Sequence, residues 1–162
     1  MKTAIDVGLD GSHCLRANRD IRANELFLRM EGVLTDRPNR YTLQVGTNLH
    51  LSPGNLTLDS EGVHLYPWIY ANHSCRPNGR VVGRDLVALR FIPRGEEITF
   101  DYDTTEYDMA SAFVCHCEHL ECRGAIRGYR YLTPLQRKSL EHLVNAHLYL
   151  LSDHEAVSVE AE

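Results

Sequence analysis

The sequence predicts a mostly β fold in which short antiparallel sheets precede one C-terminal helix. The first ninety residues alternate brief apolar stretches with frequent turn residues, which is typical of short strands. A helix-start signal followed by leucines at near-helical spacing comes only near the end. With 162 residues, 43% of them hydrophobic and 24% charged, the chain suits one soluble domain with its own core.

Three hairpins are expected in the first part of the chain. Each consists of two apolar stretches joined by a turn that contains glycine. The expected pairs are Ile5–Leu9 with His13–Ala17, Tyr41–Val45 with Leu49–Leu51, and Arg80–Val82 with Leu86–Phe91.

Two further stretches are predicted to be strands. Glu25–Leu34 carries alternating apolar residues and predicts one half-buried strand. A tight turn at residues 93–95 leads into Glu96–Tyr102, which also alternates. Because side chains alternate across a strand, Phe100 and Tyr102 should face the same side.

The C-terminal part predicts a helix over residues 132–152. Thr133 is a good N-cap and Pro134 fits the first helical position. Leucines then recur at near-helical spacing as far as Leu151. We expect this helix to pack on the domain, and a dimer contact through it is the alternative. Residues 153–162 are polar and acidic and are expected to form a disordered tail.

Four of the five cysteines have the spacing of a metal site. They are Cys75, Cys115, Cys117 and Cys122. The start of the chain lacks a signal peptide, so an intracellular location with reduced thiols is expected and metal binding is favoured over disulfides. Four thiolates satisfy tetrahedral zinc, and His116 or His119 are alternative ligands. Cys14 is expected to be an ordinary buried thiol.

The charge pattern argues against nucleic-acid binding by general electrostatics, because the net charge is −5. No apolar run approaches the roughly 20 residues of a membrane span. Residues 96–121 contain eight acids and no lysine or arginine. This acidic stretch either steers a cationic substrate or is a solvated face.

Two short segments concentrate polar or aromatic groups. Asn72-His73-Ser74-Cys75 offers an amide, an imidazole, a hydroxyl and a thiol in succession, and a hydrogen-bonded turn before Pro77 is the plain alternative. Phe100 and Tyr102 form an aromatic pair of a kind that is more often core than chemistry.

Together these segments resemble the SET-domain protein lysine methyltransferases. The resemblance lies in three motifs in the family's order: residues 72–78 (Asn-His-Ser-Cys-Arg-Pro-Asn), residues 95–102 (Gly-Glu-Glu-Ile-Thr-Phe-Asp-Tyr) and the post-SET Cys-x-Cys-x4-Cys-Arg-Gly at residues 115–124. It is specific over residues 66–124. Residues 19–25 resemble the family's early turn, and the match over residues 3–65 is diffuse.

The resemblance implies a β-clip SET fold in which the strand at residues 95–102 threads under the 72–75 loop as a pseudoknot. It implies S-adenosylmethionine as the methyl donor, with Asn72 and His73 at the cofactor and Tyr102 at both the cofactor and the methyl-transfer point. It also implies that Cys75 completes a zinc site with the three late cysteines. The implied domains are SET at 1–110, post-SET at 111–131 and a helix at 132–152.

The resemblance also implies a narrow channel for the substrate lysine, to which we assign Phe100, Phe113 and Tyr70. A lysine ammonium must lose its proton before it attacks the methyl group, and an apolar channel beside a sulfonium favours that loss without a strong general base. Phe100 lacks a hydroxyl that would hold water against the nitrogen, so di- or trimethylation is expected.

Two departures from the family pattern bear on the cofactor. The early Gly-x-Gly that lets backbone approach the donor reads Gly11-Ser12-His13 here, and these three residues are assigned to the cofactor site. Ile69 stands where the family often has arginine.

Two other functions are therefore weighed beside a protein lysine methyltransferase. One is a catalytically weak module that binds a partner through its zinc-stapled surface. The other is a methyltransferase for a small amine or a biosynthetic peptide. A histone-like tail is one possible protein substrate, and the location is cytoplasmic, or nuclear in a eukaryotic host.

Overall fold

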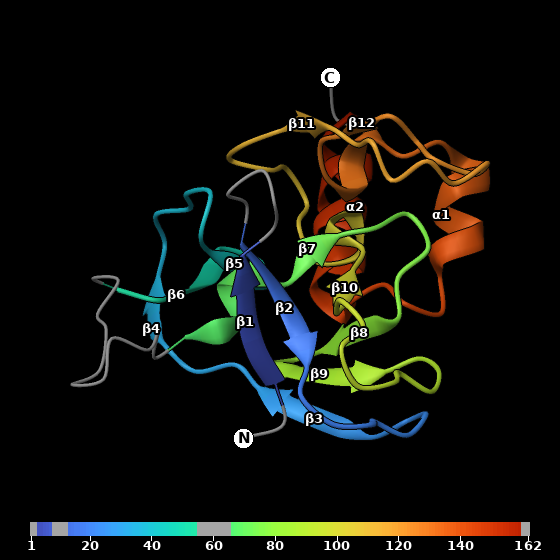
Figure 1. Ribbon diagram of the computed structural model, residues 1–162. Helices are drawn as coiled ribbons and strands as arrows, with labels where there is room; N and C mark the ends of the chain where they lie inside the picture. The colour runs from blue at the N-terminus through green and yellow to red at the C-terminus, as the bar shows by residue number, and fades with distance from the viewer. Residues whose placement is uncertain (1–2, 8–12, 55–65, 160–162) are drawn as a thin grey trace.

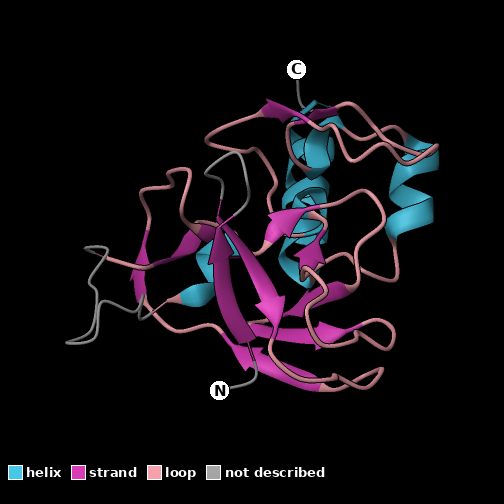
Figure 2. Cartoon of the chain, viewed as in Figure 1, coloured by secondary structure: helices cyan, strands magenta, loops and turns pink. Residues whose placement is uncertain are grey.

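The computed structural model describes residues 3–7, 13–54 and 66–159. Its strands are short and fall into five small sheets, while the two α-helices lie together on one side (Figures 1 and 2). The mostly β architecture expected from the turn pattern is confirmed. No helix within the described ranges is long and apolar enough to cross a membrane.

The three predicted hairpins all form. They consist of β1 (Thr3–Val7) with β2 (His13–Ala17), β5 (Leu43–Gly46) with β6 (Leu49–Ser52), and β8 (Gly79–Val82) with β9 (Asp85–Ala88). Local turn chemistry was enough to find them because each hairpin pairs neighbours in the sequence. The turn that joins β1 to β2 lies outside the described residues.

The single strand predicted over Glu25–Leu34 is wrong. The chain forms β3 (Leu26–Arg29), which joins β9, and β4 (Val33–Thr35), which joins β6 in a different sheet. Gly32 lies between them with φ +156°, and a Cβ there would meet the Ser52 carbonyl oxygen at 2.2 Å. This close approach lets the chain pass from one sheet to the next.

The strand predicted over Glu96–Tyr102 is shorter than expected. Only β10 (Thr99–Phe100) pairs as a strand, and it lies parallel to β7 (Asn72–His73). A 3₁₀ turn over Tyr102–Thr104 follows at once, and the Asp101 side chain accepts a hydrogen bond from the Asp103 N–H at its start. Another 3₁₀ turn, over Pro67–Tyr70, precedes β7.

Two helices replace the single C-terminal helix that was predicted. α1 spans Pro134–Leu140 and begins with the expected Thr133 cap, in a full capping box with Gln136. The chain then leaves the helix because the Asn145 amide donates to the carbonyls of Val81 (3.1 Å) and Thr104 (3.2 Å).

α2 (Ala146–Val159) begins directly after Asn145. It continues well past residue 152, so most of the expected disordered tail is helical. Residues 160–162 lie outside the described part of the chain.

Two apolar clusters of buried residues follow one another along the chain. The larger one is formed by residues 15–100 and includes Leu15, Leu86 and Ile98, all fully buried. The smaller one is formed by residues 107–148 and holds α1 and α2 on the domain. A last small sheet of β11 (Phe113–Val114) and β12 (Ala125–Ile126) frames the segment with the three late cysteines.

Candidate functional site

The parallel β7–β10 pair brings two of the three sequence motifs together. Asn72 lies opposite Thr99 and His73 opposite Phe100, and the Ser74 N–H donates to the Phe100 carbonyl at 3.2 Å. Asn78 fixes this arrangement, since its amide donates to the Glu97 carbonyl (2.7 Å) and accepts from the Thr99 N–H (2.9 Å). Hydrogen bonds therefore fix the polar 72–75 segment beside residues 97–100.

The Asn72 side chain is held in place by two hydrogen bonds. Its Nδ2 donates to the His13 carbonyl at 3.3 Å and to Glu97 Oε1 at 2.8 Å. Both N–H groups are thus used, and among the described residues Oδ1 has no hydrogen-bond partner. An amide held this way offers an acceptor to a ligand.

Of the three residues predicted at the altered glycine motif, only His13 can be located. It is solvent-exposed, and its ring lies 5.1 Å from that of Tyr70. Gly11 and Ser12 fall outside the described residues. His13 reaches the site through its carbonyl, which holds the Asn72 amide.

His73 connects the polar loop to the cysteines. Its Nδ1 accepts a hydrogen bond from the Tyr102 N–H at 3.2 Å, and its Nε2 lies 3.3 Å from Cys75 Sγ. Burial, assisted by the Arg123 charge, lowers the pKa of His73 to about 3, so the ring is neutral. A neutral imidazole has one donor and one acceptor, so Nε2 carries the proton and donates it to the Cys75 sulfur.

Tyr102 lies at the centre of an aromatic group. Its ring centroid lies 4.8 Å from that of Phe100, 5.4 Å from His73 and 5.9 Å from Phe113. Its hydroxyl donates to the Ala71 carbonyl at 2.9 Å. Burial, with the Glu106 and Glu97 charges adding to it, raises the pKa of Tyr102 far above its ordinary value. This hydroxyl therefore stays protonated and serves as a hydrogen-bonding group.

Two cavities share Asn72, Tyr102 and Phe113 in their walls. The first, of about 370 Å³, is also lined by Phe100 and Glu106. The second, of about 450 Å³, is also lined by His73 and residues 114–117.

The predicted channel residues divide between these cavities and their surroundings. Phe100 and Phe113 line the first cavity, as expected. The described lining includes the neighbours Ile69 and Ala71 but does not include Tyr70. Tyr70 instead packs its ring against that of His13, with 5.1 Å between the ring centroids.

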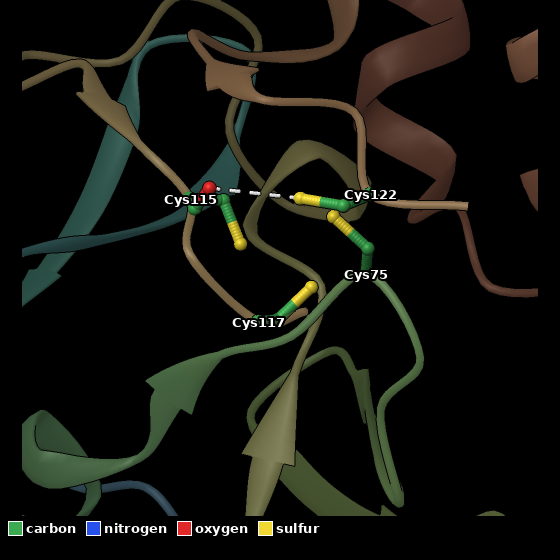
Figure 3. Close-up of side chains that lie close together, drawn as sticks. All are labelled: Cys75, Cys115, Cys117 and Cys122. Atoms are coloured by element: carbon green, nitrogen blue, oxygen red, sulfur yellow. Dashed lines mark hydrogen bonds between the residues drawn. The ribbon is translucent and has the colours of Figure 1, made fainter. Parts of the chain in front are cut away.

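The four predicted cysteines converge on one point (Figure 3). All four sulfur atoms, of Cys75, Cys115, Cys117 and Cys122, lie within 4.8 Å of one another. Cys75 comes from the loop after β7, and the other three come from the loop between β11 and β12. His116 and His119 are exposed and lie outside the cluster defined by the described residues.

The donor set fits a tetrahedral zinc ion. A Zn–S distance of about 2.3 Å places the sulfurs roughly 3.8 Å apart, which lies within the 4.8 Å limit on the sulfur separations found here. Burial raises the pKa of the Cys75 thiol strongly and that of Cys115 to about 11. Hydrogen bonds from neighbouring residues overcome burial and lower the pKa of Cys117 to about 6, so this thiol ionises most easily, and a cation would favour ionisation of the others. A metal at this point would join the post-SET segment to the β7 loop.

Arg123 makes a second, metal-independent connection between the same segments. Its guanidinium contacts Asp101 Oδ1 at 2.5 Å and Asp103 Oδ2 at 2.9 Å, and its backbone N–H donates to Cys75 Sγ at 3.5 Å. All three charged side chains are at most 9% exposed. Burial raises the pKa of Asp101 to about 6 even though Arg123 opposes the shift.

Sequence reasoning missed Arg123 and Glu106 as site residues. Arg123 was noted only as part of the post-SET motif, and Glu106 only as one of the acids of residues 96–121. The available signal for Glu106 was its spacing of four residues from Tyr102, which puts both on one face of a helical turn. The Glu106 N–H indeed donates to the Tyr102 carbonyl at 2.9 Å.

Comparison with known proteins agrees with this geometry. The model of the family described as SET domain matches residues 12–103. A histone-lysine N-methyltransferase, H3 lysine-36 specific, of Yarrowia lipolytica is 33% identical over 132 residues, covering 70% of this chain and 17% of its own length. Methyltransferase flvH of Aspergillus flavus is 35% identical over 91 residues, covering 51% of this chain and 46% of its own.

A solved structure has the same fold. KRYPTONITE in complex with mCHG DNA and SAH superposes with a TM-score of 0.56 at 20% identity, over 77% of this chain and 29% of that one. The present chain spans less than a fifth of the length of the H3 lysine-36-specific relatives from Yarrowia lipolytica, Saccharomyces cerevisiae and Eremothecium gossypii.

Proposed function

This chain belongs to the SET-domain family, and from that premise we propose that it is an S-adenosylmethionine-dependent protein-lysine N-methyltransferase. The observation that carries the proposal is the wall shared by the two cavities. Asn72, Tyr102 and Phe113 line both spaces. A donor in one cavity and an amine in the other would meet at Tyr102, the arrangement that in-line transfer requires.

The second cavity suits the cofactor. Its volume lies within the range of about 300–1,000 Å³ found for cofactor sites. Asn72 lines this cavity with Tyr102 and Phe113, and His73 and residues 114–117 form the rest of the wall. S-adenosylmethionine, when bound, supplies a methyl group activated by a sulfonium.

The first cavity suits the substrate amine. Phe100 and Phe113 supply apolar walls that strip water from an entering lysine, which lowers the pKa of its ammonium. The Tyr102 hydroxyl donates to Ala71, so its oxygen lone pairs remain available to orient an N–H of the amine. The relatives named as histone-lysine methyltransferases support a histone-like tail as the substrate.

Zinc, in this proposal, is structural. Four thiolates complete its coordination and leave no position for water or substrate, as in closed structural sites. The Cys75 set then holds residues 114–117 in place as a wall of the cofactor cavity. The metal takes no part in methyl transfer.

Two measurements test the proposed function. Calorimetric titration of the chain with S-adenosylmethionine should show binding at micromolar concentrations, and labelled cofactor should transfer its methyl group to histone tails, ribosomal proteins or lysate. Tyr102→Phe should keep cofactor binding and lose at least tenfold in methyl transfer. Tyr131→Phe, which removes an exposed hydroxyl bonded to Asp108, is the matched control. A wild-type chain that binds no cofactor at millimolar concentration would instead be the silent interaction module.

A small amine is a second candidate substrate. The similarity to a relative named only as a methyltransferase, of which this chain covers nearly half, favours it. The same labelled assay, run on a panel of aliphatic amines and amino acids beside the protein substrates, separates the two. Higher kcat/KM for any small amine than for every protein substrate would replace the leading proposal.

Phe100 should set the number of methyl groups that are added. It is 6% exposed and packs against Tyr102 in the wall of the substrate cavity, where it offers no hydroxyl to hold a water. Phe100→Tyr should therefore shift the product from di- or trimethyl toward monomethyl lysine. Mass spectrometry of the product measures the shift, with Phe100→Leu as the control without a hydroxyl. An unchanged distribution of products in Phe100→Tyr contradicts the assignment.

A further inference from the structure

Glu106 places a carboxylate in the cavity that also holds Tyr102. The chain makes one helical turn between them, closed by the Glu106 N–H donating to the Tyr102 carbonyl at 2.9 Å. Residues four apart on such a turn lie on the same face. Both side chains line the 370 Å³ cavity, together with Phe100 and Phe113. The acid therefore faces the space assigned to the substrate amine.

The Glu106 carboxylate is buried and forms no ion pair with any described residue. The residue is 9% exposed, and none of the salt bridges among the described residues includes it. Its Oε1 accepts a hydrogen bond from the Gln44 N–H at 2.7 Å. Within the described part of the chain Oε2 has no hydrogen-bond partner. A buried anion of this kind is costly unless a ligand supplies the missing charge.

Neighbouring contacts hold the carboxylate in place. Gln44 belongs to β5, and its side-chain oxygen accepts from the Tyr107 N–H at 2.8 Å while its backbone N–H donates to Glu106. The two hydrogen bonds run in opposite directions across the same pair of segments. They fix the turn against β5, so Glu106 is held in the lining of the cavity.

The charge of this carboxylate depends on its surroundings. Burial raises the pKa of Glu106 to about 7, and the Gln44 N–H opposes the shift only partly. A group that titrates near neutral pH is well suited to exchange a proton under physiological conditions. The pKa of the substrate's aliphatic ammonium shifts downward, since burial and a nearby sulfonium both lower it.

We propose that Glu106 recognises the substrate's ammonium group and accepts its proton before methyl transfer. The inference rests on the proposed methyltransferase function and adds the group that receives the proton. One N–H bond of the ammonium breaks, its electron pair stays on nitrogen, and the proton forms an O–H bond with the carboxylate. The neutral nitrogen then bonds to the methyl carbon, while the electrons of the broken carbon–sulfur bond remain on sulfur. Glu106 returns its proton to solvent before the next substrate binds.

The substrate class follows from this role. The cavity should select aliphatic amines that are cationic at neutral pH, and it should reject neutral isosteres such as alcohols and amides. An apolar channel alone would favour the neutral isosteres, because they cost less to desolvate.

Glu106→Gln is the decisive variant because it changes charge and leaves shape almost intact. The glutamine oxygen can still accept from the Gln44 N–H, so a purely structural role would be preserved. Glu141→Gln, at an exposed position, is the matched control. The pH profile of kcat/KM should be measured from pH 6 to 10, and the Kd for S-adenosylmethionine by calorimetry.

Other ionisable groups surround Glu106. Their effects on the pH profile are the same in wild type and in Glu106→Gln, so they drop out when the two profiles are compared. Arg40 and Tyr41 line the cavity from the segment before β5, and Tyr102 lies on the same turn as Glu106. His147 of α2 contacts the Thr105 carbonyl at 2.9 Å behind the turn. All four are present in both proteins, so a difference between the two profiles reports on position 106.

The expected result is a loss of about 10²–10³-fold in kcat/KM at pH 7, of the size that a general base contributes. The Kd for the cofactor should stay within about twofold. The loss should shrink as pH rises, because more amine then arrives already deprotonated. An unchanged kcat/KM, or a loss of equal size at every pH, overturns the proposal.

A binding experiment separates failure of this inference from failure of the proposed function. n-Butylammonium should bind wild type at pH 8 in calorimetry, and Glu106→Gln should bind it at least tenfold more weakly. Equal binding to the two proteins, or none to wild type, overturns the ammonium site even where methyl transfer is active. A chain without methyltransferase activity that still discriminates in this way retains the ammonium site and loses only the proposed reaction.

Discussion

The chain before residue 101 is held together by buried apolar side chains, whereas residues 114–124 are held in place mainly by charge and sulfur. Leu15, Leu86 and Ile98 are fully buried in the first region. In the second, Val114 is 62% exposed and Leu120 fully exposed, and the segment is linked to the rest of the molecule by Arg123 and by the approach of its three cysteines to Cys75. The candidate site takes one wall from each region. It can therefore be taken apart without unfolding the core.

The largest expected effect comes from removing the cation that joins the two regions. Arg123→Met leaves Asp101 and Asp103 buried without a counter-charge, and should lower the free energy of unfolding by about 3–5 kcal/mol. Urea unfolding followed by circular dichroism measures it. Arg130→Met breaks an exposed pair with Asp108 and should cost only about 0–1 kcal/mol. Equal losses of free energy of unfolding in the two variants would mean that the buried ion pairs of Arg123 stabilise the protein no more than the exposed pair of Arg130.

A cavity in the apolar region should have the next largest effect. Ile98→Ala deletes fully buried methyl groups and should cost about 2–5 kcal/mol, while Ile98→Val should cost about 0.5–1.5 kcal/mol. Zinc content should be unchanged in both folded variants, because the cysteines do not depend on this core. Unfolding in urea and metal analysis check the two statements. Loss of zinc from folded Ile98→Val would mean that the regions are coupled through the core.

The stability of the protein should depend on pH through Glu106, which lies between the two regions. Burial raises the folded-state pKa of Glu106 to about 7, above the 4.5 of an ordinary glutamate, so the folded state binds this proton more tightly than the unfolded state. Wild type should therefore lose stability as pH rises from about 4.5 to 7, whereas Glu106→Gln should lack that loss. The free energy of unfolding of the variant relative to wild type should rise by about 1–3 kcal/mol between pH 4 and pH 8. If the difference in free energy of unfolding between variant and wild type does not change with pH, the raised pKa of Glu106 is contradicted.

Metal loss should have the smallest effect on the core and a clear effect on the site. Cys75→Ser should lower zinc from about one ion per chain, change the unfolding of the apolar region by less than about 1 kcal/mol, and reduce methyl transfer at least tenfold. Elemental analysis, urea unfolding and the labelled assay measure these in turn. Cys14→Ala, which removes the cysteine outside the cluster, should keep its zinc. Full zinc occupancy in Cys75→Ser would place the fourth ligand elsewhere, with His116 or His119 the first to examine.

The sequence predicted those features that depend on neighbours along the chain. The hairpin turns and the Thr133 cap are local, and they form as expected. The break at Gly32 was missed because it depends on the Ser52 carbonyl, and the end of α1 because it depends on contacts of Asn145 with Val81 and Thr104. Tertiary partners such as these leave no periodicity in the sequence.

The same distinction applies to the site. The cysteine cluster could be predicted from ligand chemistry, and its four members do converge. The roles proposed for Glu106 and Arg123 could not, because they depend on Gln44 and on Asp101 across the fold. The meeting of residues 72–73 with 99–100 came from the family resemblance, since nothing in either stretch alone specifies a parallel pair.

The separation of Cys75 from Cys122 also fixes an order of events during synthesis. The two sulfurs meet in space, although roughly 50 residues lie between them in the chain. A ribosome adding about 5–20 residues per second needs about 2 to 10 seconds to pass from one codon to the other. During that interval the chain before residue 101 can collapse while the Cys75 thiol still lacks the three other cysteines of the cluster. A metal that needs all four cysteines can therefore bind only after the first apolar region has been synthesised, and α1 and α2 follow later still.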